Sequence, residues 1–147
     1  MVNEDLISAK LAELGDRLER VKLHCPATAQ ALAGDRDALD LVSFNLLLAV
    51  QSCADIASHI IADEGWPSAV TLADGFERLR EHGVIEEGTA RALSRAAGMR
   101  NVLAHGYGNV DVAMVHVAAS SGTRDLNAFA REVARFLQRS RSGAAPA

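Results

Sequence analysis

The strongest constraint that the sequence places on the fold is a long segment, residues 35–64, that contains neither proline nor glycine. Gly34 and Asp35 are typical of a helix stop followed by a new helix N-cap, and Gly65 is typical of a helix end. Apolar residues recur through the segment at steps of three and four, and additional ones widen the stripe beyond a single face. We therefore predict one long helix that is apolar on more than one side, as in a central bundle helix or one that also faces a second subunit.

The same periodicity predicts shorter helices around this central one. They comprise an N-terminal helix that ends near Pro26, a helix from Ser68 to Gly83, a helix from about Glu86 to His105, and a last helical region that starts near Asp111, breaks at Ser120, Ser121 and Gly122, and resumes at Asp125. Aromatic residues make up only 4% of the chain, whereas sheets enrich aromatic and β-branched side chains. The prediction is an all-α fold, an antiparallel bundle of about five helices.

The chain length fits a single domain. With 147 residues there is room for one core, which we place in residues 1–139, followed by a small polar tail, 140–147, that we expect to be flexible. The uninterrupted apolar runs are far shorter than the roughly 20 residues that span a bilayer. The N-terminus, with Asn3, Glu4 and Asp5, lacks the pattern of a secretory signal. We expect a cytoplasmic protein with no membrane association, in which Cys25 and Cys53 are reduced thiols.

The charge distribution limits how the protein can handle a polyanion. The net charge of −4 argues against broad, nonspecific nucleic-acid binding. Residues 88–105, however, carry Arg91, Arg95 and Arg100 and no acidic residue, which suggests that a phosphate is handled at one place. The alternative is that Arg91 and Arg95, four residues apart, form an ordinary solvated helix face. The cysteines and histidines match no zinc-ligand spacing, so no metal site is expected.

One stretch combines residue types that are suited to chemistry on a phosphodiester: Gly98-Met99-Arg100-Asn101-Val102-Leu103-Ala104-His105-Gly106-Tyr107-Gly108. Arginine offers a cationic fork for phosphate, and histidine can transfer protons near neutral pH. In a regular helix Arg100 and His105 would point roughly 140° apart, so they converge only if the helix end relaxes. Gly106 and Gly108 supply that freedom. The alternative is that both cations simply decorate a helix C-terminus, where the dipole favours them.

These residues resemble the R-x4-H-x-Y signature of the HepT family, a branch of the HEPN superfamily of helical ribonucleases. Arg100, Asn101, His105 and Tyr107 occupy the signature positions. Residues 51–61 are similar to the family's second helix, and Phe76 with Leu79 and residues 83–85 are similar to its third. The resemblance covers about residues 35–118.

The resemblance implies a toxin of a HEPN/MNT toxin-antitoxin pair that cleaves RNA without a metal ion or other cofactor. Arg100 and His105 would be the catalytic pair, and Asn101 a supporting polar residue. Tyr107 would be the hydroxyl that a minimal nucleotidyltransferase (MNT) antitoxin adenylylates with ATP and magnesium. The family is dimeric, and two-fold symmetry would supply both a general acid and a general base from two copies of one histidine.

Two points stay open at this stage. Asp55 and His59, four residues apart on the central helix, are expected either to form a hydrogen-bonded pair that orients the active-site histidine or to be an ordinary surface pair. The function is either RNA cleavage or that of a non-catalytic helical module that binds a nucleotide or a nucleotidyltransferase partner. A third hypothesis is that the chain forms a dimeric bundle with a purely structural role.

Overall fold

The structure, a computed structural model, describes residues 2–105 and 111–143. Every regular element in these two ranges is a helix, which confirms the all-α prediction. The elements are α1 (Glu4–His24), α2 (Ala29–Ala33), α3 (Arg36–Glu64), α4 (Leu72–Glu81), α5 (Glu87–His105), α6 (Val112–Val117), the π-helical segment η1 (Ala118–Gly122) and α7 (Thr123–Arg141). Five of them, α1, α3, α4, α5 and α7, are ten residues or longer.

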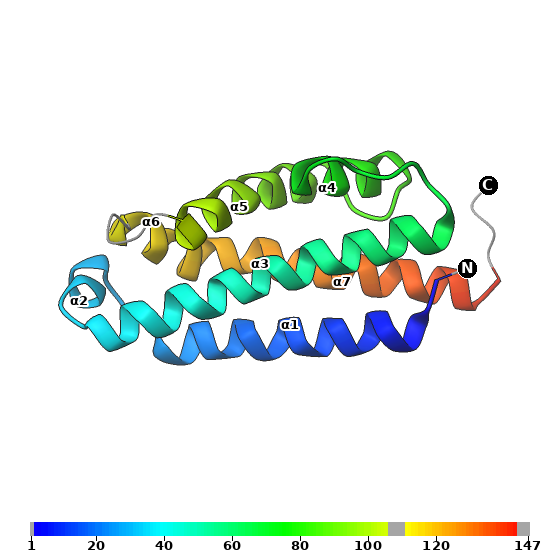
Figure 1. The fold of residues 1–147 in the computed structure, drawn as a ribbon. Helices are drawn as coiled ribbons and strands as arrows, with labels where there is room; N and C mark the ends of the chain where they lie inside the picture. Colours follow the sequence, from blue (N-terminus) through cyan, green and yellow to red (C-terminus); the bar gives the residue numbers. More distant parts are fainter. Residues whose placement is uncertain (1, 106–110, 144–147) are drawn as a thin grey trace.

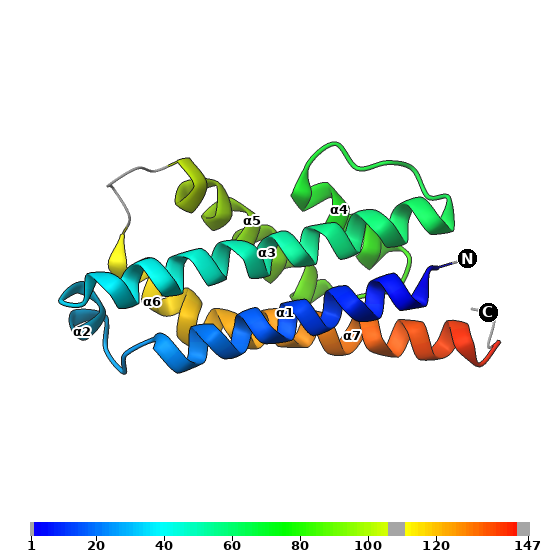
Figure 2. The same cartoon turned by 60° about the horizontal axis from the view of Figure 1, so that its bottom comes forward.

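The long helices run up and down along one common direction. Helix α1 runs from the end of the molecule that carries both termini to the end that carries α2, and α3 returns (Figure 1). After α4, helix α5 runs back toward α6, and α7 returns to the terminal end (Figure 1). Helix α3 lies between α1 and α5 in both views, and it contacts each of them (Figure 2). The arrangement is the antiparallel bundle that the sequence predicts.

Side-chain caps explain where five of the described helices begin. The Asn3 side chain accepts a hydrogen bond from the Leu6 amide at the start of α1, and the Asp35 side chain does the same for Ala38 at the start of α3. Helix α3 ends at Gly65, whose φ of 72° lies in the left-handed region that favours glycine. The predicted stop at Gly34 and the unbroken run to Gly65 are confirmed.

Three predicted boundaries are wrong. The helix expected from Ser68 starts four residues later, at Leu72, because Thr71 is the residue that caps it. The last region does not break at residues 120–122 but stays helical as η1. There the hydroxyls of Ser120 and Ser121 donate to carbonyls three and four residues back, which accommodates the wider π turn. Helix α7 also includes Ser140 and Arg141, which the prediction placed in the tail, whereas residues 144–147 lie outside the described ranges.

The buried apolar residues form two clusters that lie one after the other along α3. The larger cluster holds the part of α3 from Ala49 onward with side chains of α1, α4, α5 and α7. The smaller one holds Ala38, Val42 and Leu46 of α3 with side chains of α1, α2, α6 and η1. Met99 of α5 packs against both clusters. Helix α3 therefore carries the core along its whole length.

Helix α3 is also, among the described helices, the one long and apolar enough to cross a membrane. Its mean hydropathy over an 18-residue window is 1.4, and 56% of that window is buried inside the protein. Length and composition alone do not separate a core helix from a spanning one. The burial agrees with a core helix, because the rest of the bundle covers more than half of this window.

A buried carboxylate joins α7 to the start of α5. Glu132, only 9% exposed, accepts a hydrogen bond from the Glu86 amide at 2.6 Å and another from the Thr89 hydroxyl, also at 2.6 Å. The Glu86 amide lies at the N-terminus of α5, where backbone donors lack helical partners. Glu132 thus acts as a cap supplied by a distant helix, and it fixes α5, the helix that carries Arg100, on α7.

We predict that Glu132→Ala lowers the free energy of unfolding by about 2–3 kcal/mol, because it leaves buried donors unpaired. Glu132→Gln should cost less, since the amide oxygen still accepts one hydrogen bond. The measurement is urea unfolding followed by circular dichroism. Glu13→Ala, at an exposed position of α1, is the control and should change the stability by less than about 0.5 kcal/mol. Equal losses in Glu132→Ala and Glu13→Ala would contradict the capping role.

Candidate active site

The candidate catalytic motif occupies the C-terminal end of α5. Arg100 and Asn101 lie within the helix, and His105 is its last residue. The side chain of His105, and the residues Gly106, Tyr107 and Gly108, lie outside what the structure describes. The geometry of the site is therefore that of Arg100, Asn101 and the groups around them.

The guanidinium of Arg100 is held at both of its terminal nitrogens. Nη2 donates to Oε1 of Gln51 on α3 at 2.9 Å, and Nη1 donates to Oδ1 of the neighbouring Asn101 at 3.3 Å. Arg100 is half-buried, and its Nε is buried without a hydrogen-bond partner in the described part of the chain. The contact with Gln51 spans two helices, so it ties the direction of the guanidinium to the packing of α5 on α3.

Two further polar contacts extend from Gln51 along α3 and then to α1. Nε2 of Gln51 donates to Oδ1 of Asp55 at 3.0 Å, and Oδ2 of Asp55 lies 3.9 Å from Nζ of Lys10. Five side chains from three helices thus form one polar chain, which we call the Arg100 chain: Lys10, Asp55, Gln51, Arg100 and Asn101. These contacts link α1 and α5 to α3, which lies between them (Figure 1).

Of the two alternatives for Asp55 and His59, the hydrogen-bonded pair is not formed. Within the described ranges no hydrogen bond joins the two, because the Asp55 carboxylate is engaged by Gln51 on one oxygen and faces Lys10 with the other. Helical spacing makes residues 51 and 59 equally eligible neighbours of residue 55. The structure favours Gln51, which links Asp55 to Arg100 rather than to a histidine.

The three arginines of residues 88–105 do not form a single patch. Arg91 is exposed, and its Nη2 lies 2.8 Å from Oε1 of Glu87, one turn earlier. This is an ordinary ion pair of a solvated helix face, which is the alternative interpretation of Arg91. Arg95 is exposed and lines a groove on another side of α5. Among the hydrogen bonds of the described residues, Arg100 is the one of the three arginines that bonds to a side chain of α3.

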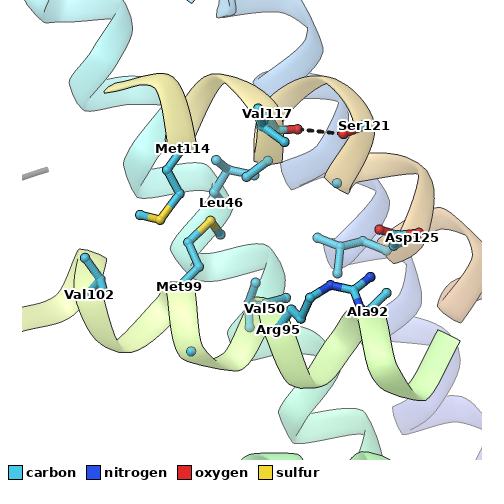
Figure 3. A pocket seen from close by; sticks show the side chains of 15 residues that line it. Leu46, Val50, Ala92, Arg95, Met99, Val102, Met114, Val117, Ser121 and Asp125 are labelled. Atoms are coloured by element: carbon cyan, nitrogen blue, oxygen red, sulfur yellow. Dashed lines mark hydrogen bonds between the residues drawn. The ribbon is translucent and has the colours of Figure 1, made fainter. Parts of the chain in front are cut away.

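That groove separates α5 from α6, η1 and α7. Its volume is about 680 Å³, and its walls are mostly apolar, with Met99 of α5 and Met114 of α6 on opposite sides (Figure 3). Arg95 and Asp125 supply charged groups at one end (Figure 3). Arg100 is not among the lining residues. Helix α5 thus directs Met99 to the groove, whereas the next residue, Arg100, is directed to Gln51 of α3.

An exposed apolar surface continues from the Arg100 chain along α3. Phe44, 53% exposed, and Leu41, 36% exposed, lie on α3 with the half-buried Leu48. Phe44, Leu48, Gln51 and Asp55 follow one another at steps of four, three and four, so they share one face of the helix. The guanidinium of Arg17 lies 5.9 Å from the centre of the Phe44 ring. Large apolar side chains therefore lie next to the polar chain.

The described residues contain no group of three or more histidine, cysteine or acidic side chains placed to hold a metal ion. Cys53 is fully buried in the larger core cluster, and burial raises the pKa of its thiol. Burial also raises the pKa of the Cys25 thiol. Both thiols are thereby disfavoured as metal ligands or nucleophiles.

The residue that sequence reasoning did not place in the site is Gln51. The sequence places Gln51 only in the segment 51–61, which is similar to the second helix of the family. Its position four residues before Asp55 is a signal on the same helix, but its bond to Arg100 spans 49 residues of sequence and becomes visible only when α5 is placed on α3.

Comparisons with known proteins give consistent results. A family model described as "Ribonuclease HepT-like" matches residues 14–133. An mRNA nuclease HepT of Shewanella oneidensis is 27% identical over 115 residues, which are 77% of this chain and 85% of that protein. A putative RNase of Archaeoglobus fulgidus is 35% identical over 74 residues. That match covers 50% of this chain and only 55% of the relative's length.

A solved structure agrees with the fold. The tri-AMPylated Shewanella oneidensis HEPN toxin, in complex with an MNT antitoxin, superimposes with a TM-score of 0.82. It shares 22% sequence identity, and the superposition covers 89% of this chain and 98% of that one. At this level of identity the likeness concerns the helical fold.

Proposed function

Since the chain belongs to the HepT-like ribonuclease family, we propose that it is a metal-independent endoribonuclease and the toxin of a HEPN/MNT toxin-antitoxin pair. Arg100 and His105 form the catalytic pair, and Asn101 supports Arg100. The observation that carries the proposal is the half-buried guanidinium of Arg100, bound by Gln51 and Asn101 at the end of α5, five residues before His105. Metal-free phosphodiester cleavage needs a fixed cation for the phosphate and a histidine that transfers protons.

The proposed reaction is an internal transesterification of RNA. A ribose 2′-oxygen attacks the adjacent phosphorus as a base removes its proton, and the 5′-oxygen leaves as an acid protonates it. The products are a 2′,3′-cyclic phosphate and a free 5′-hydroxyl. Arg100 stabilises the charge that develops on the phosphorus oxygens, and His105 transfers the protons. No cofactor takes part in this chemistry.

We place the active site at the interface of a two-fold homodimer. One step needs a base and the other an acid, and a second copy of His105 provides the second group. The exposed Leu41 and Phe44, on the α3 face that continues into the Arg100 chain, support this arrangement because they offer apolar surface for a partner next to the site. Two copies of Arg100 would also concentrate positive charge where an otherwise acidic protein must attract RNA.

The proposed partner is a nucleotidyltransferase antitoxin in the cytoplasm. It transfers AMP from ATP, with magnesium, to the hydroxyl of Tyr107, two residues after His105. A nucleotide in this position adds bulk and negative charge next to the catalytic pair, so it blocks and repels an RNA phosphate. The complex of the similar Shewanella toxin with its antitoxin supports the proposal.

We predict that the purified chain cleaves RNA in EDTA and that His105→Ala and Arg100→Ala abolish the cleavage. The assay uses a labelled RNA and resolves the fragments on a gel. Arg95→Ala, which removes an exposed arginine from the same helix, should cleave like the unaltered chain. An RNA with a single 2′-deoxy substitution at the cut site should resist cleavage there, because the attacking oxygen is missing.

Two outcomes would contradict this proposal. Cleavage that persists in His105→Ala would exclude the catalytic pair. Binding of RNA or ATP in calorimetry, without cleavage under any condition, would favour the non-catalytic binding module instead.

We further predict that co-expression with a cognate MNT nucleotidyltransferase raises the intact mass by the mass of one or more AMP groups. The increase should disappear in Tyr107→Phe, which lacks the acceptor oxygen, and the AMP-modified protein should no longer cleave RNA. An unchanged mass, or modification of the Tyr107→Phe variant to the same extent, would refute Tyr107 as the acceptor.

A further inference from the structure

The groups that hold Arg100 are both neutral. The acceptors at its two terminal nitrogens are amide oxygens, Oε1 of Gln51 and Oδ1 of Asn101. Arginine in proteins more often meets carboxylates, which bind the guanidinium strongly but also cancel its charge. An amide oxygen fixes the direction of the guanidinium and leaves its full positive charge available. A guanidinium held by amides therefore attracts a phosphate more strongly than one that is already paired with a carboxylate.

The orientation of the Gln51 amide is set from the other side. An ionised carboxylate can only accept hydrogen bonds, so Asp55 requires the NH₂ group of Gln51 to face it, as it does at 3.0 Å. The oxygen of Gln51 must then face Arg100. A reversed amide would put its NH₂ group against the NH₂ group of Arg100 and its oxygen against the Asp55 carboxylate, and both contacts would be repulsive.

The one acidic side chain of the Arg100 chain, Asp55, is separated from Arg100 by Gln51. Asp55 contacts Gln51 rather than Arg100, and Lys10 of α1 lies 3.9 Å from the other Asp55 oxygen. The acid thus acts on Arg100 through a neutral amide, while a second cation partly balances its charge. Asp55 therefore determines which way the Gln51 amide faces, and the Gln51 oxygen in turn determines the direction of the Arg100 guanidinium.

We propose that Gln51 is the positioning residue for Arg100 and that Asp55 fixes the orientation of Gln51. The inference rests on the proposed function, because it assigns how the ribonuclease site keeps an oriented and uncompensated cation for the scissile phosphate. Orientation in advance of binding matters, because a guanidinium that must first become ordered contributes less to the transition state.

Two substitutions at one position separate orientation from charge. Gln51→Leu removes the acceptor, and we expect kcat to fall by about 10- to 100-fold with little change in KM, as for other residues that orient a catalytic group. Gln51→Glu keeps an acceptor but adds a negative charge beside Arg100. We expect it to raise KM for RNA and to make the dependence of KM on salt shallower by about one phosphate contact.

Matched controls come from Gln138, an exposed glutamine on α7. Gln138→Leu and Gln138→Glu make the same changes of volume and charge away from the Arg100 chain and should leave kcat, KM and the salt dependence unchanged. A thermal unfolding midpoint for Gln51→Leu close to that of Gln138→Leu shows that the loss is local.

A second measurement does not depend on cleavage. In ¹⁵N spectra the guanidinium of Arg100, held at both ends, should rotate slowly and give separate Nη signals, which are assigned by their loss in Arg100→Ala. The separate signals should persist in Gln138→Leu and merge in Gln51→Leu. Unchanged Arg100 signals in Gln51→Leu would overturn the proposal whether or not the chain cleaves RNA.

The kinetic outcomes distinguish this proposal from the proposed function. Full activity in Gln51→Leu together with inactivity in Arg100→Ala overturns the positioning role and leaves the ribonuclease assignment intact. Full activity in Arg100→Ala overturns the role of Arg100 in catalysis, and with it the catalytic purpose of the positioning. Loss of kcat in Gln51→Leu with merged Nη signals and unchanged Gln138 variants supports the proposal.

Discussion

A helix of 29 residues with buried apolar side chains along its whole length is stable only where other helices cover those side chains. In α3 the fully buried residues include Val42, Val50, Ile56 and Ile60, and each such side chain stabilises the fold by about 1.5–3 kcal/mol when water is removed from it. Other helices must therefore cover these side chains, and α1 and α5 lie on either side of α3 (Figure 1). The same packing brings Lys10, Gln51 with Asp55, and Arg100 into one line, so the polar chain follows from the way the core is covered.

Two adjacent residues of α5 have different roles, since Met99 packs in the core and Arg100 belongs to the candidate site. Met99 packs against both core clusters, which fixes the rotation of the helix about its axis. With that rotation fixed, Arg100 is directed to α3 and meets Gln51. Burial of part of a guanidinium is unfavourable unless its nitrogens find acceptors, and Gln51 and Asn101 supply two of them. The Glu132 cap holds the other end of α5 on α7. Packing and hydrogen bonds thus agree on a single placement of Arg100.

The sequence predicted those features that depend on neighbours along the chain. Periodicity and the cap at Asp35 located α3, because both are properties of one helix. The predicted break at Ser120–Gly122 was wrong because serine hydroxyls can also bond to helix carbonyls, and only the packing of α6 and α7 decides between the two. Spacing puts Gln51 and His59 equally close to Asp55, but the prediction considered only His59. The choice depends on Arg100 and Lys10, which reach α3 from other helices.

The central claim is that the guanidinium of Arg100, while held by Gln51, binds the phosphate that is cleaved. A crystal structure of the chain with a short 2′-O-methyl RNA, which cannot supply the attacking hydroxyl, tests this most directly. The account predicts a phosphate within about 3 Å of the Arg100 guanidinium, with the Gln51 contact retained. An RNA bound elsewhere on the surface, or an Arg100 that leaves Gln51 to reach the phosphate, would contradict it.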